Sequence, residues 1–413
     1  MSVRASALRP DDFAGANLSI QKGLEAIRTH LGMTVAYVSE FVGDKSVFRA
    51  VDAPGLEAVI KPGDEKPLDD VFCRHILAGR LPELMPDVSA NPFAMTMPIM
   101  QEIPIGAHLS VPIRLEGGET YGMFCCLSLE KDPSLNDRDL SMMRVFADMA
   151  AHQIAEDVKS QKSLSEKSAR IDEIIEQRLF RPVFQPICDL STGEPVGFEA
   201  LCRFRPEPYR SPDKWFADAA EVGRGIDLEL AVMQQALADA AILPAEVYLS
   251  VNASPGLLVS GRLQAVIAGC TNRRILVEVT EHVAVSDYTV LSQALGDLRE
   301  AGALIAIDDA GSGYSSLQHI VQIKPDVIKI DTSLVRDIDK DPARRALMSA
   351  LIFFARETAC TMIAEGVETE AERLMLTTLG VTKAQGYLFS KPMLIEDAAA
   401  LLGRRADAQR LTA

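Results

Sequence analysis

The strongest constraint on the fold is that, from Arg181 onward, apolar strand-like runs alternate regularly with helical segments. Eight strands with helical crossovers in one domain predict a (β/α)8 barrel. The first two runs are separated only by residues 191–194, which are too few for a crossover helix, so we expect this pair to be antiparallel. The expected strands are residues 183–190, 195–202, 247–252, 275–280, 304–308, 327–330, 361–364 and 383–389.

Polar side chains stand at or near the carboxyl ends of these runs, from the second to the eighth. In a barrel the carboxyl ends converge on one mouth, where active sites are found. So many acids in one place cannot all be ionised without cations, and oxygen ligands without His or Cys select hard metals such as Mg²⁺ or Mn²⁺. Two such ions would form the clamp used for in-line displacement at phosphorus. The residues are Glu199, Asn252, Glu278, Asp308, Asp309, Lys329, Glu365 and Gln385.

Glu199, in the strand-like run 196–204, also has a simpler interpretation. Taken alone it fits an internal ion pair with Arg203, because buried acids are usually paired. The further acids at the ends of further strands favour a shared site instead.

Length and composition limit the other possibilities. The 413 residues, 48% of them apolar, are enough for two domains with full cores. No apolar run approaches the roughly 20 residues of a membrane span, and residues 1–14 lack a signal-peptide core, so we expect a cytoplasmic protein without a membrane partner. The net charge of −16 argues against a nucleic-acid polymer as partner, because no basic stripe exists to release counterions.

The seven cysteines are scattered and show no CxxC spacing, so neither a disulfide framework nor a zinc site is expected. Cys73 and His75 could be a ligand pair, but we interpret them as core and capping residues. Cys125 and Cys126 are adjacent on an expected strand, so they point to opposite faces and are assigned to packing.

The first 157 residues follow a different pattern, with an amphipathic helix at residues 17–31, two strand pairs and a long amphipathic helix from about Leu140. This order resembles the GAF domain, a small-ligand sensor and dimerisation module. The resemblance implies an α+β sensor domain over residues 1–157 with an unidentified small-molecule ligand. It rests on residues 72–76, 86–87, 91–92, 108–113 and 117–123.

Residues 158–177 are expected to link the two domains. The stretch 159–169 is polar but lacks Gly and Pro, so the preceding helix could continue through it, and an apolar stripe resumes at Ile171. A continuous helix could pair with the same stripe of a second subunit, so we expect a homodimer. The alternative is a flexible linker, which the serine content favours.

Residues 178–403 resemble the EAL domain, the family of cyclic di-GMP phosphodiesterases, which have a barrel with an antiparallel first strand; residues 404–413 remain as a tail. Each motif is weak alone, but eight in order are very specific. They are residues 184–187 (FQPI), 199–203 (EALCR), 251–254 (VNAS), 278–281 (EVTE), 308–317 (DDAGSGYSSL), 329–331 (KID), 364–369 (AEGVET) and 385–389 (QGYLF).

The resemblance implies hydrolysis of cyclic di-GMP to linear pGpG with two Mg²⁺ or Mn²⁺ ions. The catalytic residues would be Glu199, Lys329, which holds the attacking water, and Glu365, a metal ligand or general base. Glu281 would brace a loop. The metal ligands would be Glu199, Asn252, Glu278, Asp308, Asp309 and Glu365, and the substrate contacts would be Gln185, Leu201, Arg203, Glu368 and Gln385.

The chain departs from the family at two positions. Ala310 stands where the family usually has Phe, and Ser312 where it often has Thr. Ala310 puts regulation in doubt more than catalysis, because every ligand position is filled. The alternative to an enzyme is a receptor that binds cyclic di-GMP and signals through a partner, but receptors of that kind usually lack some of the acids. A barrel enzyme with an unrelated substrate is disfavoured by the order of the motifs.

Overall fold

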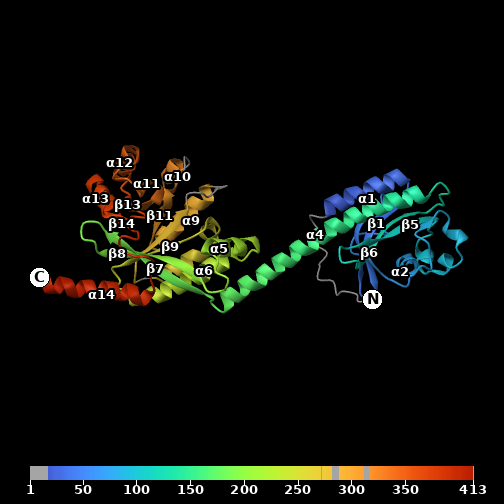
Figure 1. Ribbon diagram of the computed structural model, residues 1–413, viewed down its shortest axis with the longest axis horizontal. Coiled ribbons are helices and arrows are strands. Elements are labelled where there is room, and N and C mark those ends of the chain that lie inside the picture. The colour runs from blue at the N-terminus through green and yellow to red at the C-terminus, as the bar shows by residue number, and fades with distance from the viewer. Residues whose placement is uncertain (1–16, 271, 281–287, 311–315, 413) are drawn as a thin grey trace. The chain divides into compact units, whose positions relative to one another are not determined.

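The computed structural model describes residues 17–270, 272–280, 288–310 and 316–412, and the chain divides into two units, Met1–Ser165 and Glu166–Ala413 (Figure 1). The boundary between them falls inside helix α4 (Asp137–Glu176), which is continuous through residues 158–176. No helix in the described part of the chain combines the length and the apolar character needed to cross a membrane.

The first unit is built on an antiparallel sheet with helices on both faces. α1 (Asn17–Leu31) places Ile20, Leu24 and Ile27 at the spacing of one helical face, and this face packs on the sheet together with the first half of α4. The other face is covered by α2 (Phe72–Leu77), η2 (Val88–Ala90), η3 (Ala94–Thr96) and α3 (Ile99–Glu102). The sheet order is β3 (Glu65–Pro67), β2 (Lys45–Asp52), β1 (Val35–Val42), β6 (Thr120–Ser128), β5 (Ala107–Arg114) and β4 (Leu84–Met85).

The adjacent cysteines of β6 lie in different cores, as predicted. Cys126 belongs to the core under α1 and α4, whereas Cys125 belongs to the core under α2. Cys73 and His75 are buried in the second of these cores. The seven cysteines are all free thiols.

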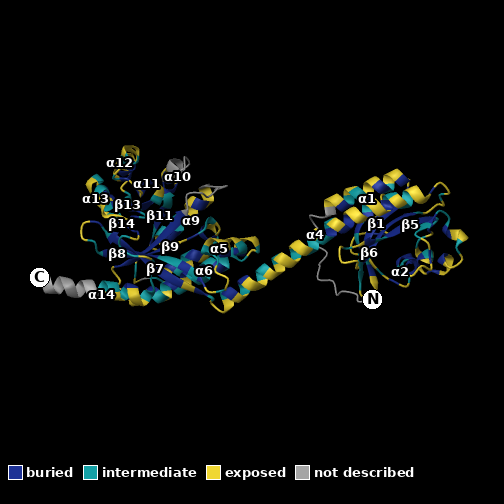
Figure 2. Cartoon of the chain, viewed as in Figure 1, coloured by how far each residue is buried: buried dark blue, intermediate teal, exposed yellow. Residues whose placement is uncertain are grey.

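The second unit is a closed eight-stranded barrel, which confirms the predicted architecture. β7 pairs antiparallel with both of its neighbours, and the other strand pairs are parallel, so the prediction of an antiparallel first strand is also correct. Buried residues follow the barrel strands (Figure 2). The strands are β7 (Phe180–Asp189), β8 (Pro195–Phe204), β9 (Tyr248–Asn252), β10 (Ile275–Thr280), β11 (Ala303–Ala310), β12 (Val327–Ile330), β13 (Thr361–Ala364) and β14 (Lys383–Ala384).

The connecting segments are mostly helical. They bury an apolar shell against the outer face of the strands, while a smaller group that includes Ile187, Tyr248 and Leu276 fills the barrel interior. The helices are α5 (Pro212–Glu221), α6 (Gly225–Asp239), η4 (Ala240–Ile242), α7 (Pro255–Val259), α8 (Arg262–Ala268), α9 (Tyr288–Glu300), α10 (Ser316–Ile323), α11 (Thr332–Val335), α12 (Pro342–Glu357), α13 (Glu370–Leu379) and α14 (Ile395–Thr412).

The last strand is shorter than predicted. Residues 385–389 were expected to extend it, but the chain turns after Ala384. At Gly386 a Cβ would lie only 2.2 Å from the carbonyl oxygen of Val367, so the loops after β13 and β14 approach each other at a distance that only glycine permits. Met393 then takes up pairing with Phe184 of β7.

Candidate active site

The centre of the barrel mouth is the ammonium group of Lys329. This side chain lies on β12 and is fully buried. Carboxylates carried by β8, β10, β11 and the residue after β13 surround it. The distances from Nζ are 2.6 Å to Glu365 Oε1, 2.7 Å to Glu278 Oε2, 3.0 Å to Asp308 Oδ1 and 3.6 Å to Glu199 Oε2.

Burial and mutual repulsion change the protonation of this cluster. Burial, followed by the charge of Glu199, raises the pKa of Glu278 well above its usual range. Burial is also the main cause that raises the pKa of Glu365 to about 8. For Lys329 burial acts to lower the pKa, but the surrounding carboxylates outweigh it and the pKa is raised. The cluster therefore favours a charged Lys329 and uncharged Glu278 and Glu365 unless further positive charge is supplied.

A bulge brings two consecutive aspartates to the same site. Neighbouring residues on a regular strand point to opposite faces. The register between β11 and β12 shifts between Ile307 and Ala310, and Asp309 has a left-handed backbone with φ of 55°. As a result Asp308 and Asp309 both reach Glu365, and one carboxylate oxygen from each of the three lies within 4.8 Å of the others.

Two amide side chains orient Glu199. Gln385 Nε2 donates to Glu199 Oε2 at 2.6 Å and to Glu365 Oε1 at 3.2 Å. Asn252 Nδ2 donates to Glu199 Oε1 at 3.3 Å. The carboxylates are thus held in fixed positions by strands β8 and β9 and by the residue after β14.

The residues present fit a site for hard divalent cations. Every candidate ligand offers oxygen, the donor that Mg²⁺, Mn²⁺ and Ca²⁺ prefer. Gln385 Oε1 is buried and accepts no hydrogen bond from any described residue, so at least one oxygen acceptor is available. With Asp309 the cluster holds five carboxylates against one ammonium, so four negative charges are in excess when all the acids ionise.

The predicted substrate contacts lie at different distances from this cluster. Gln185 on β7 is directly opposite Glu199 and donates from Nε2 to the carbonyl of Ser390 at 3.2 Å. Leu201 and Arg203 follow Glu199 on the same face of β8, as the period of a strand requires. Both residues lie beyond Glu199 towards the carboxyl end of β8, and in the described structure they do not touch the carboxylates of the cluster.

Glu368 lies apart from the cluster. It is more than half exposed and faces Arg336 at 3.9 Å, its ion-pair partner in the described part of the chain. Ala310 is fully buried in the apolar shell around the barrel strands. Glu281 and Ser312, which the sequence also singled out, lie outside the described residues.

Two supporting residues were missed from the sequence. Ser250 donates from Oγ to Glu278 Oε1, and its signal is a second polar residue on the face of Asn252 in an otherwise apolar strand. Glu372 is buried and accepts the backbone N–H groups of Asp337, Glu368 and Thr369, so it fixes the loop after β13. Its signal is the capping-box spacing from Thr369 to Glu372.

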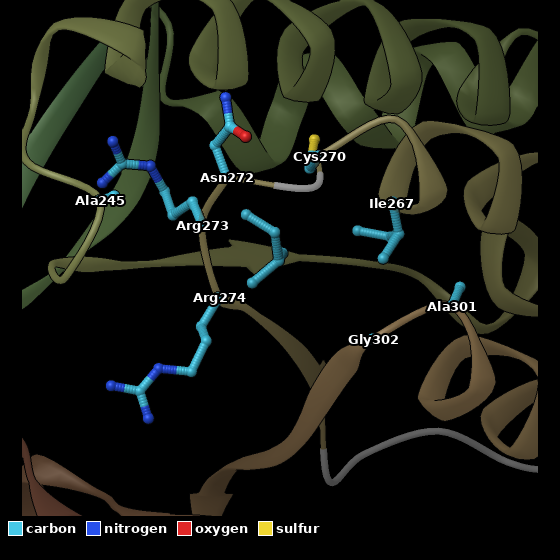
Figure 3. Close-up of a pocket in the computed structure, with 9 residues that line it drawn as sticks. Ala245, Ile267, Cys270, Asn272, Arg273, Arg274, Ala301 and Gly302 are labelled. Atoms are coloured by element: carbon cyan, nitrogen blue, oxygen red, sulfur yellow. The ribbon is translucent and has the colours of Figure 1, made fainter.

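A second hollow, of about 450 Å³, lies at the opposite end of the barrel, where β10 and β11 begin (Figure 3). Arg273 there donates to the carbonyls of Ala240, Leu243, Pro244 and Val247, which makes it a structural clamp. The lining contains no carboxylate, so the carboxylate cluster at the mouth is the better candidate for catalysis.

The closed barrel has one antiparallel strand, so the second unit is a modified (β/α)8 barrel, and the oxygen ligands at its mouth could hold a metal ion. Residues 168–392 match the EAL domain, and residues 20–155 match the GAF domain. The chain therefore belongs to the EAL domain family and carries a GAF domain before the barrel.

Individual relatives agree with this assignment. The chain is 34% identical over 233 residues to the uncharacterised protein y4lL of Sinorhizobium fredii, which covers 54% of this chain and 28% of that protein. It is 31% identical over 251 residues to the probable cyclic di-GMP phosphodiesterase PdeG of Escherichia coli, which covers 56% of this chain and 49% of that one. The chain thus spans less than half the length of these curated relatives.

Solved structures give the same fold. The PaMucR phosphodiesterase in complex with c-di-GMP is 27% identical, covers 56% of this chain and 99% of its own, and superposes with a TM-score of 0.51. The EAL enzyme Bd1971 with bound cAMP and cyclic di-GMP superposes over 90% of this chain and 93% of its own, with a TM-score of 0.55. Its sequence identity is 20%, so this similarity supports the fold and nothing further.

The raised pKa of Glu365 predicts a pH effect on stability in metal-free protein. Its folded pKa of about 8 exceeds the ordinary value of 4.5, so it contributes stability that is present below pH 4.5 and lost as pH rises through 8. The measured quantity is the difference in the free energy of unfolding between the unsubstituted protein and Glu365→Gln, both in EDTA. This difference should fall by roughly 1–4 kcal/mol as the pH rises from 4.5 to above 8. Urea unfolding at several pH values measures it.

Glu368→Gln is the matched control, because it removes an exposed carboxylate after the same strand. Its difference from the unsubstituted protein should stay nearly flat with pH. Equal slopes for the two variants would contradict the assignment of a raised pKa to Glu365.

Proposed function

We propose that this protein hydrolyses one phosphodiester bond of cyclic di-GMP to give linear pGpG. The observation that carries the proposal is the set of four carboxylates around a fully buried lysine at the barrel mouth, with Asp309 beside two of them. The name of the related PdeG and the ligand in the PaMucR complex support this choice of substrate.

We further propose that the cluster holds two Mg²⁺ or Mn²⁺ ions. Two divalent cations would neutralise the four excess negative charges, and when bound they supply charge neutralisation for the phosphate and acidify a water molecule. The ligands would be Glu199, Asn252, Glu278, Asp308, Asp309 and Glu365.

The chain's own side chains position the reaction. Lys329 is charged and fully buried among carboxylates, so its Nζ can donate a hydrogen bond to the attacking water and hold it in line with the O3′ leaving group. With cations bound, the carboxylate of Glu365 would be ionised and could accept the proton that the water loses. The P–O3′ bond breaks as the new P–O bond forms, and O3′ takes a proton from solvent. Gln185, Leu201, Arg203, Glu368 and Gln385 would contact the dinucleotide.

Activity should depend on divalent cations. With Mg²⁺ or Mn²⁺ the protein should convert cyclic di-GMP to pGpG, and EDTA should abolish turnover, because the carboxylate cluster needs cations to exist as a site. Chromatography of the reaction products measures both. Full activity in metal-free buffer would contradict the proposal, and binding without turnover with either metal would favour the receptor alternative.

Two variants serve as controls for this experiment. Glu199→Ala should be inactive at every metal concentration, because it removes a ligand. Arg203→Ala should mainly raise KM, because its contacts to phosphate are made in the ground state and the transition state alike.

We propose that the GAF domain binds a small molecule between its sheet and α2. His75 Nδ1 and His108 Nδ1 are buried there and have no hydrogen-bond partner among the described residues, and the His108 ring packs edge-on against Phe72 of α2. The full-length protein, once denatured, should release a stoichiometric small molecule detectable by mass spectrometry. His108→Phe should release much less. Equal release from both proteins, or none, would contradict the proposal.

We propose a homodimer that acts in the cytoplasm, where free cysteines such as the seven of this chain persist. Val145 and Met149 on α4 are one helical turn apart and are 57% and 64% exposed, which suits a helix-to-helix contact with a second copy. Sedimentation velocity should give a dimer, and Val145→Glu combined with Met149→Glu should give a monomer. A monomeric unsubstituted protein at micromolar concentration would contradict this.

A further inference from the structure

The first two barrel strands form a ladder of side-chain pairs that leads outward from the carboxylate cluster. Directly opposite residues of an antiparallel pair share one face of the sheet. The pair Gln185 and Glu199 lies at the cluster. The pairs Val183 with Leu201 and Arg181 with Arg203 follow on the same face, so the order is polar, apolar, cationic.

This face of the ladder is the inner one. Ile187 belongs to the same alternation on β7 and packs in the barrel interior against Tyr248 and Leu276. Phe180 and Phe204, which have the opposite orientation, pack outside with Trp215. Since a strand rises about 3.4 Å per residue, the arginine pair lies about 14 Å along β8 from Glu199.

The outermost pair consists of two like charges without a counter-ion. The guanidinium of Arg181 is exposed and bonds to no described residue, and that of Arg203 donates only to the carbonyl of Cys202, at 2.7 Å, within the described structure. Like charges directly opposite each other on a sheet are destabilising. The chain has 58 acidic residues and a net charge of −16, and Asp239 and Glu396 line the same hollow as Arg181, yet neither guanidinium forms an ion pair with a described residue.

We propose that Arg181 is a substrate-binding residue that acts with Arg203 to hold the second phosphate of cyclic di-GMP. The inference rests on the proposed function. One phosphate lies at the carboxylate cluster, the intervening nucleoside lies over Val183 and Leu201, and the second phosphate accepts hydrogen bonds from both guanidinium groups. The two phosphates are linked through one ribose and lie closer together than the roughly 14 Å between the backbones of Glu199 and Arg203, so both arginine side chains must extend back along the ladder to reach the second phosphate.

The test compares two substrates. Cyclic di-GMP has two phosphates, whereas bis(p-nitrophenyl) phosphate has one phosphodiester and no second phosphate. Arg181→Ala should raise KM for cyclic di-GMP about tenfold with kcat within about twofold, and leave the hydrolysis of bis(p-nitrophenyl) phosphate unchanged. Arg181→Lys keeps the charge but not the bidentate geometry, so its KM should lie between those of the two proteins.

Arg274→Ala is the matched control. Arg274 is also exposed and without a partner in the described structure, but it stands before β10 at the opposite end of the barrel, so its removal should leave KM unchanged. The melting temperature of Arg181→Ala should not fall, because the substitution relieves a repulsion.

The outcomes separate the inference from the proposed function. An unchanged KM in Arg181→Ala, with active unsubstituted protein, overturns the inference alone. An equal loss on both substrates, or a lower melting temperature, assigns Arg181 a structural role and also overturns it. If the unsubstituted protein hydrolyses neither substrate with Mg²⁺ or Mn²⁺, the proposed function fails and the inference fails with it.

Discussion

The barrel mouth depends on one buried ammonium. An isolated lysine at the position of Lys329 would lose its proton, and isolated carboxylates at Glu278 and Glu365 would not ionise, because burial disfavours every charged form. Together they stabilise one another, yet the acids outnumber the lysine. Removing one partner of such a cluster costs more than the pair contributes, because it leaves an uncompensated charge. Bound cations would relieve the same imbalance.

Backbone strain serves the same site. The left-handed conformation of Asp309 costs of order 1–3 kcal/mol, and the neighbouring strand must lose its regular register to accommodate it. In return two consecutive carboxylates, which a regular strand would separate, converge on Glu365. The stability lost at this bulge is offset by the apolar shell that closes the barrel around it.

The antiparallel first strand changes what can reach the mouth. In a wholly parallel barrel every strand begins at the far end, but β7 begins at the mouth, so Arg181 near its start stands beside Arg203 near the end of β8. The last turns of α4 pack there too, with Ile171 and Ile174 in the same apolar cluster as Phe180 and Phe204. The end of α4 therefore contacts β7 and β8, the strands that carry the ladder of side-chain pairs.

The sequence by itself determined the order of helices and strands, the antiparallel first pair and the acids at the strand ends, because hydrophobic period and loop length are local properties. It determined neither that β14 stops at Ala384 nor how the consecutive side chains of Asp308 and Asp309, both expected at the site, come to face it together. The first depends on Gly386 meeting Val367, and the second on a register shift against β12. The position of Ser250 beside Glu278 is likewise a product of strand register. Register is decided by contacts between segments that are distant in the chain, so only the tertiary structure could decide it.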